Sequence, residues 1–353
     1  MNSIKSFYKG KRVLITGHNG FKGTWMCQIL KDCGANVIGY SLEPTTEPSL
    51  YDITNMSNDM ISIIGDIRDL EHLMDVFDKY QPEIVFHLAA QPIVRTSYEE
   101  PVFTYGTNVM GTVNICEAIR QHNCTKSFVN VTTDKVYKNN EWEWGYREND
   151  ELGGYDPYSN SKSCSELVTK SYINSFFKNM SVAVSTCRAG NVIGGGDFAK
   201  DRIIPDCIRA QENKSEIIVR NPYSTRPYQH VLEPVCAYLQ LAMLQYADKL
   251  KFEGHYNIGP DECDCVTTGE LVGLFCDKWG GNVSWKEIDE KGAPHEAGFL
   301  KLDCSKIKRV VGWKPKWHIE EAIENVVRWS KVYFAEGDIV AEMKSEIHSY
   351  LED

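Results

Sequence analysis

The chain has 353 residues, a length that allows roughly two domains and a large buried core. It carries 38 Lys and Arg against 49 Asp and Glu, and its net charge of −11 disfavours a nucleic-acid-binding surface, which needs excess positive charge. A hydrophobic fraction of 42% and a charged fraction of 25% are ordinary for a folded globular protein, so global disorder is excluded.

Short apolar runs alternate with helical periods from Arg12 onward, a pattern typical of βαβ units that form a parallel sheet. Helices are predicted between the strands, among them 101–120 and 161–176. The predicted strands cover residues 12–16, 36–40, 61–64, 83–87, 126–132 and 181–188. The fold class is therefore α/β, a Rossmann-type doubly wound parallel sheet with a smaller C-terminal α/β substrate domain.

After Arg188 the alternation gives way to GNVIGGGD, whose glycines suit a loop. We place a dinucleotide-binding domain at residues 1–190 and a mainly substrate-binding domain at 191–353, with the chain returning to the first domain around 228–260. Further helices are predicted at 233–246 and 319–333. Ligands of such sheets bind at the carboxyl ends of the strands, here between the two domains.

Twelve cysteines are spread along the chain without a CxxC pair or a short disulfide framework, so we expect reduced thiols and no metal site. The N-terminus lacks the apolar core of a signal peptide, and no apolar stretch reaches the roughly 18 residues of a spanning helix. We therefore expect a cytoplasmic protein with neither a membrane nor a nucleic acid as partner.

Glycines directly follow the first predicted strand and open the first helix, where a backbone can approach a pyrophosphate closely. The spacing in TGHNGFKG is GxxGxxG rather than GxGxxG, and a tight structural turn is the alternative reading. The predicted cofactor-binding residues of this loop are Gly17, His18, Gly20, Phe21 and Gly23.

The second predicted strand ends in Tyr40 and Ser41, not in the acidic residue that usually binds the ribose diol of NAD, and Glu43 comes slightly late. His18 and Lys22 could meet the 2′-phosphate of NADP. We therefore expect NAD without excluding NADP.

The residues that follow the third and fourth predicted strands are also expected at the cofactor site, where small side chains let a cofactor lie against the backbone. These residues are Asp66, Ile67, Ala89, Ala90 and Gln91. His87, inside an apolar run, is predicted to be a buried core histidine.

Tyr158 and Lys162 stand four residues apart and therefore share one face of a predicted helix. A nearby ammonium favours the phenolate and should lower the pKa of the tyrosine toward a value useful for a general base. YxxxK alone is common on exposed helices, but the upstream glycine motif makes it more specific.

The chain resembles the extended short-chain dehydrogenase/reductase family over almost its whole length, in the blocks TGHNGFKG, AAQPIVRTSYEEPVFTYGTNVMGT, VTTDKVY, YSNSK and RAGNVIGGGD. It looks most like the nucleotide-sugar 4,6-dehydratases of that family. The phrases EWEWGYRENDELGGYDPYSNSK and RNPYSTRPYQHVLEP are similar to the branch that acts on CDP-glucose, as is His295 in PHEA, to which no role is assigned.

The resemblance implies a redox-neutral elimination that serves deoxysugar and polysaccharide synthesis. Tyr158, helped by Lys162 and Thr133, takes the proton of the sugar 4-hydroxyl while hydride moves from carbon 4 to NAD. The 4-ketone acidifies the proton on carbon 5, loss of that proton and of the 6-hydroxyl forms an enone, and the hydride returns to carbon 6.

Asp134 and Lys135 follow the fifth predicted strand, at the position where related dTDP-glucose dehydratases carry an Asp-Glu pair. The family scheme uses an acid for the 6-hydroxyl and a base for carbon 5. Asp134 can be that acid if a partly apolar site keeps it protonated, whereas Lys135 can be the base only when neutral. The alternative is that Lys135 merely pairs with Asp134 or a phosphate.

By the same resemblance, Asn108 and Arg188 belong to the cofactor side of the site. Guanidinium groups suit the geometry of a diphosphate. The residues expected to contact the nucleotide sugar are Arg95, Asn191, Arg202, Arg220, Arg226 and His230.

Three other functions remain open at this stage. A 4,6-dehydratase of another hexose nucleotide would carry the same motifs, because no spacing in the sequence distinguishes the nucleotide base. A nucleotide-sugar 4-epimerase would share the glycine loop, Tyr158 and Lys162 but would not need Asp134 and Lys135. A catalytically silent dinucleotide sensor would have no chemical reason to keep Tyr158, Lys162 and Asp134 together. The family also implies a homodimer or homotetramer, and the predicted helix 101–120 offers an apolar face for that contact.

Overall fold

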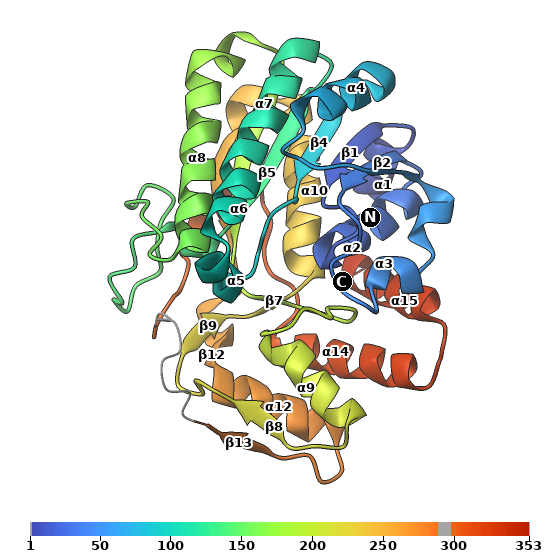
Figure 1. The fold of residues 1–353 in the computed structure, drawn as a ribbon, viewed down its shortest axis with the longest axis vertical. Coiled ribbons are helices and arrows are strands. Elements are labelled where there is room, and N and C mark those ends of the chain that lie inside the picture. Colours follow the sequence, from blue (N-terminus) through green and yellow to red (C-terminus); the bar gives the residue numbers. More distant parts are fainter. Residues whose placement is uncertain (1, 289–297, 353) are drawn as a thin grey trace.

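The computed structural model describes residues 2–288 and 298–352, so His295 lies outside the described residues. Its centre is a parallel seven-stranded sheet with the strand order β3-β2-β1-β4-β5-β6-β11 (Figure 1). Its strands are β1 Arg12–Thr16, β2 Asn36–Ser41, β3 Ile61–Ile64, β4 Ile84–His87, β5 Ser127–Thr133, β6 Ala183–Ala189 and β11 Gly254–Ile258. The order reverses between β1 and β4, which is where such sheets bind their ligands. The six predicted strands and the predicted fold class are confirmed.

Helices cover both faces of this sheet (Figure 1). α2 (Phe21–Asp32) and α10 (Leu232–Ala247) share one core with Val13 and Ile15 of β1, whereas Leu14 points into the other core. Successive side chains of a strand alternate between faces, so one apolar strand supplies both cores. The second face is covered by α4 (Leu70–Tyr80), α7 (Gly111–His122) and α8 (Pro157–Ser175).

The predicted helix 101–120 is interrupted, which corrects the expectation of one continuous element. α6 (Pro101–Tyr105) and α7 are joined by a π-helical turn over Gly106–Met110. At the end of the turn, a Cβ on Gly111 would lie 2.7 Å from a methyl carbon of Ile67, so only glycine fits. Single π turns frequently mark functional sites, and this one contains Asn108.

A second, smaller core lies at the end of the molecule below the sheet in Figure 1. It is built from α9 (Ile203–Glu212), α12 (Thr268–Trp279), α14 (Ile319–Phe334) and short strand pairs. These pairs are β7 (Val192–Ile193) with β10 (Gln229–His230), β8 (Ile217–Val219) with β13 (Trp285–Glu287), and β9 (Thr225–Pro227) with β12 (Cys265–Thr267).

The chain between residues 191 and 353 contributes to both cores. α10 and β11 belong to the sheet layers, and the C-terminal helix α15 (Ile339–Glu352) packs on α2. The remaining helices are α1 Asn2–Tyr8, α3 Leu50–Ile53, α5 Val94–Glu99, α11 Lys249–Phe252 and α13 Ser305–Val310. None of the described helices is both long and apolar enough to cross a membrane.

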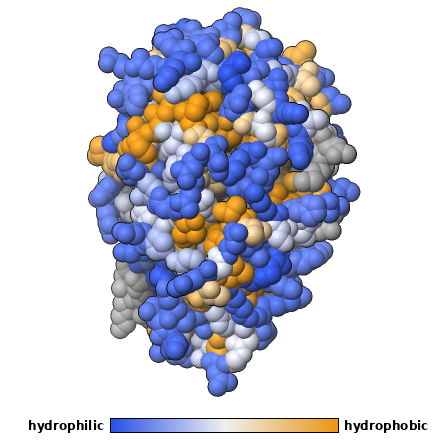
Figure 2. All heavy atoms as spheres, turned by 90° about the vertical axis from the view of Figure 1, so that its right-hand side faces the viewer, coloured by the Kyte–Doolittle hydropathy of each residue, from blue (hydrophilic) through white to orange (hydrophobic). Residues whose placement is uncertain are grey.

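The edge strand β3 exposes Ile61 and Ile64. Figure 2 looks onto the right-hand side of Figure 1 and shows hydrophobic residues in patches within a mostly hydrophilic surface.

Candidate active site

A cleft of about 1710 Å³ runs along the carboxyl ends of the strands and separates the sheet from the smaller core. The glycine loop after β1 forms one end, and the arginine-bearing segments of the smaller core form the other. Between them lie Asp134 and Lys135 after β5, and Tyr158 and Lys162 on α8. The fold thus brings together residues that are more than 100 positions apart in the chain.

The glycine loop fits a dinucleotide. Gly17 has a φ of +74°, and a Cβ there would lie 2.7 Å from the amide nitrogen of Ala89. A Cβ on Gly23 would lie 2.2 Å from the carbonyl oxygen of Gly17. Gly20 is the N-cap of α2 and offers no side-chain cap, so the first N–H groups of that helix can bind a phosphate.

His18 does not line the cleft, which corrects its assignment as a cofactor ligand through its ring. The ring is fully buried behind the loop, with Nδ1 2.8 Å from Ser41 Oγ and Nε2 2.8 Å from Ser62 Oγ. Burial lowers the pKa of His18 to about 4, so the ring is neutral near pH 7. It cannot supply a positive charge to a 2′-phosphate.

The loops after β3 and β4 line the same end of the cleft. Asp66, Ile67, Ala89, Ala90 and Gln91 all face it, and Phe21 adds an apolar wall. Asp66 is engaged by Arg68 Nε at 3.0 Å from both carboxylate oxygens, and the Arg68 guanidinium lowers the pKa of that carboxyl. Its backbone carbonyl is occupied as well, since it accepts hydrogen bonds from Tyr40 Oη and Asp69 N, each at 2.9 Å.

Asn108 stands behind the cleft and ties two parts of the site together. Its Oδ1 accepts a hydrogen bond from Gln91 N at 2.8 Å, and its Nδ2 donates to Ser161 Oγ at 2.8 Å. The loop after β4 is thereby fixed to α8. The residue supports the cofactor side of the site without being exposed to it.

Tyr158 and Lys162 share one face of α8, as predicted from their spacing. The helix begins at Pro157, before the predicted start, because Asp156 caps it by accepting a hydrogen bond from Ser159 N. Burial raises the pKa of Tyr158 to about 12, against the hydrogen bond with Thr133, which lowers it.

Instead of the lowered pKa expected from the neighbouring Lys162, the Tyr158 pKa is raised, because burial outweighs the groups that lower it. Lys162 Nζ donates to the carbonyl oxygen of Val131 at 3.1 Å, and burial lowers the pKa of Lys162 to about 8. The ammonium is thus directed toward the end of β5.

Asp134 is completely buried. Its Oδ1 accepts a hydrogen bond from Thr133 Oγ1 at 2.9 Å, and its Oδ2 has no hydrogen-bond partner among the described residues. Lys135 Nζ lies 3.6 Å from Asp134 Oδ1 and 3.4 Å from Asn191 Oδ1. The pairing of Lys135 with Asp134 is therefore present, and a buried acceptor remains for a substrate hydroxyl.

The candidate substrate-binding arginines meet three aspartates that the sequence analysis did not single out. Arg202 Nη1 lies 3.0 Å from Asp197, and Arg220 Nη1 lies 2.9 Å from Asp201. Arg220 also lies 3.7 Å from Asp206, and Arg95 lies 4.0 Å from Asp201. The cleft-lining members of the predicted set are Arg95, Asn191, Arg202, Arg220 and Arg226.

His230 is a core residue, which corrects its assignment to the substrate site. Its ring packs against Trp25 and Trp317, and Nε2 lies 3.4 Å from Glu346 Oε2 on α15. Burial lowers the pKa of His230 to about 3. Tertiary packing of the C-terminal helix, which no local pattern shows, encloses this ring.

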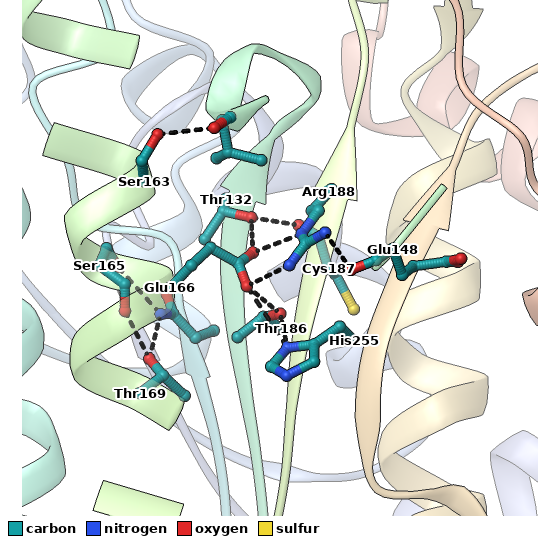
Figure 3. A network of polar contacts seen from close by, with 12 residues as sticks. Thr132, Glu148, Ser163, Ser165, Glu166, Thr169, Thr186, Cys187, Arg188 and His255 are labelled. Carbon is teal, nitrogen blue, oxygen red and sulfur yellow. Dashed lines mark hydrogen bonds and ion pairs between the residues drawn. The ribbon is translucent and has the colours of Figure 1, made fainter. Parts of the chain in front are cut away.

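Arg188 does not line the cleft but lies in a buried ion pair with Glu166, which corrects its assignment to the cofactor site (Figure 3). Its Nε and Nη2 each donate to Glu166 at 3.0 Å, and its Nη1 donates to Tyr137 Oη at 2.8 Å. Glu166 also accepts from Thr132 at 2.6 Å and from Thr186 at 2.7 Å. The network fixes β5, β6 and α8 relative to one another.

Glu166 was missed by the sequence analysis although a signal was present. It follows Lys162 by four residues and so shares the helix face that carries Tyr158. Burial alone would raise its pKa, but the hydrogen bond with His255 and the charge of Arg188 hold it well below the usual range. The carboxylate is therefore ionised throughout the neutral range.

Replacing Glu166 by glutamine should destabilise the protein by about 3–5 kcal/mol, because Arg188 would stay buried without its counter-charge. Unfolding in urea, followed by circular dichroism, measures the change. The loss should shrink toward acid pH, since a carboxylate with a lowered pKa stabilises the fold only while it is ionised. Glu151→Gln, in an exposed pair with Lys138, is the control and should cost less than about 1 kcal/mol. Equal costs for the two variants would contradict the assignment.

Cys263, Asp264 and His318 form a group outside the cleft whose ligand atoms lie within 4.8 Å of one another. Asp264 Oδ1 accepts from Ile319 N at 2.9 Å, and Oδ2 lies 2.9 Å from His318 Nδ1. These contacts anchor the start of α14 and account for the cluster without an ion.

Comparison with known proteins identifies the family. The model of the GDP-mannose 4,6 dehydratase family matches residues 14–326. A CDP-glucose 4,6-dehydratase from Salmonella typhimurium is 49% identical over 352 residues, which cover 98% of each chain. The chain belongs to the nucleotide-sugar 4,6-dehydratase family. The predicted resemblance is confirmed, since this relative represents the CDP-glucose branch.

Solved structures of the wider dehydratase and epimerase group share the fold. A UDP-glucose 4-epimerase from Thermotoga maritima with UDP-glucose superposes with a TM-score of 0.79 at 22% identity, covering 91% of this chain and 99% of that one. A dTDP-glucose 4,6-dehydratase from Bacillus anthracis in complex with NAD gives 0.76 at 20% identity, covering 91% and 97%. At these sequence identities the structural similarity shows that the chains share a fold, and it shows no more than that.

Proposed function

We propose that this protein converts CDP-glucose to CDP-4-keto-6-deoxyglucose and water, a step toward deoxysugars of surface polysaccharides. The observation that carries the proposal is the meeting of Tyr158, Thr133, Asp134 and Lys135 in one cleft beside the glycine loop. An epimerase needs only the tyrosine and the oxidation at carbon 4. The buried Asp134 with a free oxygen has a use only in the elimination.

The cofactor of the proposal is NAD. The glycine loop and the N-terminus of α2 would hold the pyrophosphate, and the loops after β3 and β4 would hold the adenosine and nicotinamide halves. Glu43 lies on the cleft near the end of β2, where an acid would repel a 2′-phosphate and favour a ribose diol. When bound, NAD accepts a hydride from carbon 4 and later returns it to carbon 6.

Tyr158 would accept the proton of the 4-hydroxyl, and its hydrogen bond with Thr133 orients the phenol oxygen for this. Lys162, held by the Val131 carbonyl, would stabilise the phenolate once a positively charged nicotinamide shares the site. Asp134 would donate a proton to the departing 6-hydroxyl. Lys135, in its neutral form, would remove the proton on carbon 5, and the resulting ammonium would give a proton back to carbon 5 when hydride is restored to carbon 6.

The arginines of the smaller core would bind the diphosphate and the nucleotide. Arg202 and Arg220 would exchange their aspartate partners for phosphate oxygens, which match the guanidinium fork equally well. Arg226 is held in place by a hydrogen bond from Nη1 to the Thr225 carbonyl at 3.0 Å.

The test is mass spectrometry of CDP-glucose incubated with the purified protein and NAD. Loss of one water without net consumption of NAD is expected. An unchanged mass with a new galactose isomer would select the epimerase instead. No change at all would refute CDP-glucose as the substrate and direct the test to other hexose nucleotides.

We further propose that two chains pair through the layer of α6, the π turn and α8. This layer exposes Val102 (86%), Met110 (51%) and Leu167 (54%), whereas most large apolar side chains of the protein are buried. Exposed apolar groups on packed neighbouring helices favour burial against a second copy, giving a homodimer or a pair of dimers.

The double variant Val102→Glu, Leu167→Glu should shift the protein to a monomer, because a paired interface would bury both carboxylates. Light scattering coupled to gel filtration measures the mass. Leu250→Glu, at an equally exposed apolar residue on α11, is the control and should leave the mass unchanged. An oligomer that survives the double variant would place the interface elsewhere.

A further inference from the structure

Lys22 occupies an unusual place, on the first turn of α2 directly inside the glycine loop. Its side chain lines the cleft, on the wall shared with Tyr158 and Lys162. The charged groups that act on it come from three other elements: Lys162 on α8, Asp134 and Lys135 after β5, and Arg202 before α9. Lys22 thus connects the phosphate-binding loop with the catalytic residues.

The surroundings of Lys22 are deficient in negative charge. Three of the four acting groups are cations, and Asp134 already accepts a hydrogen bond from Thr133 and pairs with Lys135. Asp197, another carboxylate that lines the cleft, is engaged by Arg202 at 3.0 Å. In the part of the chain that the structure describes, Lys22 Nζ has neither a hydrogen-bond acceptor nor an ion-pair partner.

A partly enclosed ammonium without a partner is poorly stabilised. Burial, followed by the charges of Arg202 and Lys162, lowers the pKa of Lys22 to about 7. The amine is therefore partly neutral at physiological pH. The group that would complete its surroundings is an anion bound between the glycine loop and the catalytic residues.

We propose that the Lys22 side chain binds the diphosphate of the dinucleotide and takes up a proton as that anion arrives. This inference rests on the proposed dinucleotide site. The glycine loop and the start of α2 offer backbone N–H groups with partial positive charge for a diphosphate, and the Lys22 ammonium would add a full charge.

Proton uptake makes the affinity for NAD dependent on pH. Below the pKa of the free amine Lys22 is already protonated, so the binding of NAD takes up few further protons. Above it each binding event must first protonate Lys22, so the dissociation constant should rise toward about tenfold per pH unit until the pKa of the complex is reached. Lys162, with a pKa of about 8, is the other lysine that can contribute to this uptake.

Calorimetric titration of NAD into the full-length protein, in two buffers of different ionisation enthalpy between about pH 7 and 9, measures both quantities. The unsubstituted protein should take up a proton and lose affinity as the pH rises. Lys22→Met should bind about tenfold more weakly at pH 7 and take up about one proton less above it. Lys22→Arg, whose charge is permanent, should bind tightly with the same reduced uptake.

Lys31→Met is the matched control, since Lys31 lies in the last turn of the same helix and pairs with Asp59. It should behave like the unsubstituted protein. Unchanged affinity and uptake in Lys22→Met would overturn the inference and assign the proton to Lys162. Failure of the unsubstituted protein to bind NAD at all would overturn the proposed cofactor itself, which separates the two failures.

Discussion

Replacing Tyr158 by phenylalanine should lower the turnover of CDP-glucose by about 10³-fold, within the range that a positioned general base contributes. The phenol oxygen is the group on α8 that can take the proton of the 4-hydroxyl, and its neighbour Thr133 orients it. The ring itself is buried, so phenylalanine fills the same space. The loss should fall on turnover rather than on the binding of NAD or substrate.

The measurement is rapid mixing of enzyme, NAD and CDP-glucose, with the absorbance of the reduced nicotinamide followed in a single turnover. No absorbance should develop in Tyr158→Phe. Thr133→Val serves as the graded comparison, since it removes the orienting hydroxyl but keeps the base, and should retain part of the rate. Rapid hydride transfer in Tyr158→Phe would show that another group takes the proton.

The pKa of about 12 for Tyr158 sets a condition on this chemistry. With such a pKa, little phenolate exists near pH 7. A positive charge in contact with the phenol favours its ionised form, and each unit of lowered pKa corresponds to about 1.4 kcal/mol. The proposed NAD would supply such a charge when bound, and Lys162 on the same face of α8 would add to it.

The sheet could be predicted from the sequence because its signals are local. Each strand is a short apolar run with a loop residue after it, and the right-handed βαβ rule then orders the strands. The pairing of Tyr158 with Lys162 was predictable for the same reason, since a spacing of four fixes a shared helix face. The same spacing of four also places Glu166 on this helix face, so its position beside Lys162 could have been predicted as well.

Burial by distant elements could not be predicted. His230 lies in a polar stretch of sequence just before a helix. Its ring is nevertheless enclosed by Trp317 and Glu346, which follow it by roughly 90 and 115 positions. His18 stands in the glycine loop, but the absence of a side chain on Gly39 leaves room for its ring behind the strand. The family motif fixed the positions of these residues without fixing which way their side chains point.

Replacing Asp134 by asparagine should leave oxidation at carbon 4 intact and reduce the loss of water by about 10²–10⁴-fold. Asparagine keeps the size of the side chain and can still accept the hydrogen bond from Thr133, now seen at 2.9 Å. It cannot donate an acidic proton to the 6-hydroxyl. Reduced nicotinamide should therefore accumulate in the first turnover and decay slowly, and normal product formation would rule out Asp134 as the acid.

Lys135→Met separates this acid from the base that acts one step earlier. In solvent deuterium oxide, Asp134→Asn should still exchange the proton on carbon 5 of the 4-keto intermediate, because removal of that proton precedes the departure of the hydroxyl. Lys135→Met should lose that exchange while keeping the oxidation. Since Lys135 Nζ lies 3.6 Å from Asp134 Oδ1, each variant also changes the surroundings of the other residue, and the double variant tests their coupling. Exchange that persists in Lys135→Met would assign the proton on carbon 5 to water or another group, and would leave Lys135 the electrostatic partner of the buried acid.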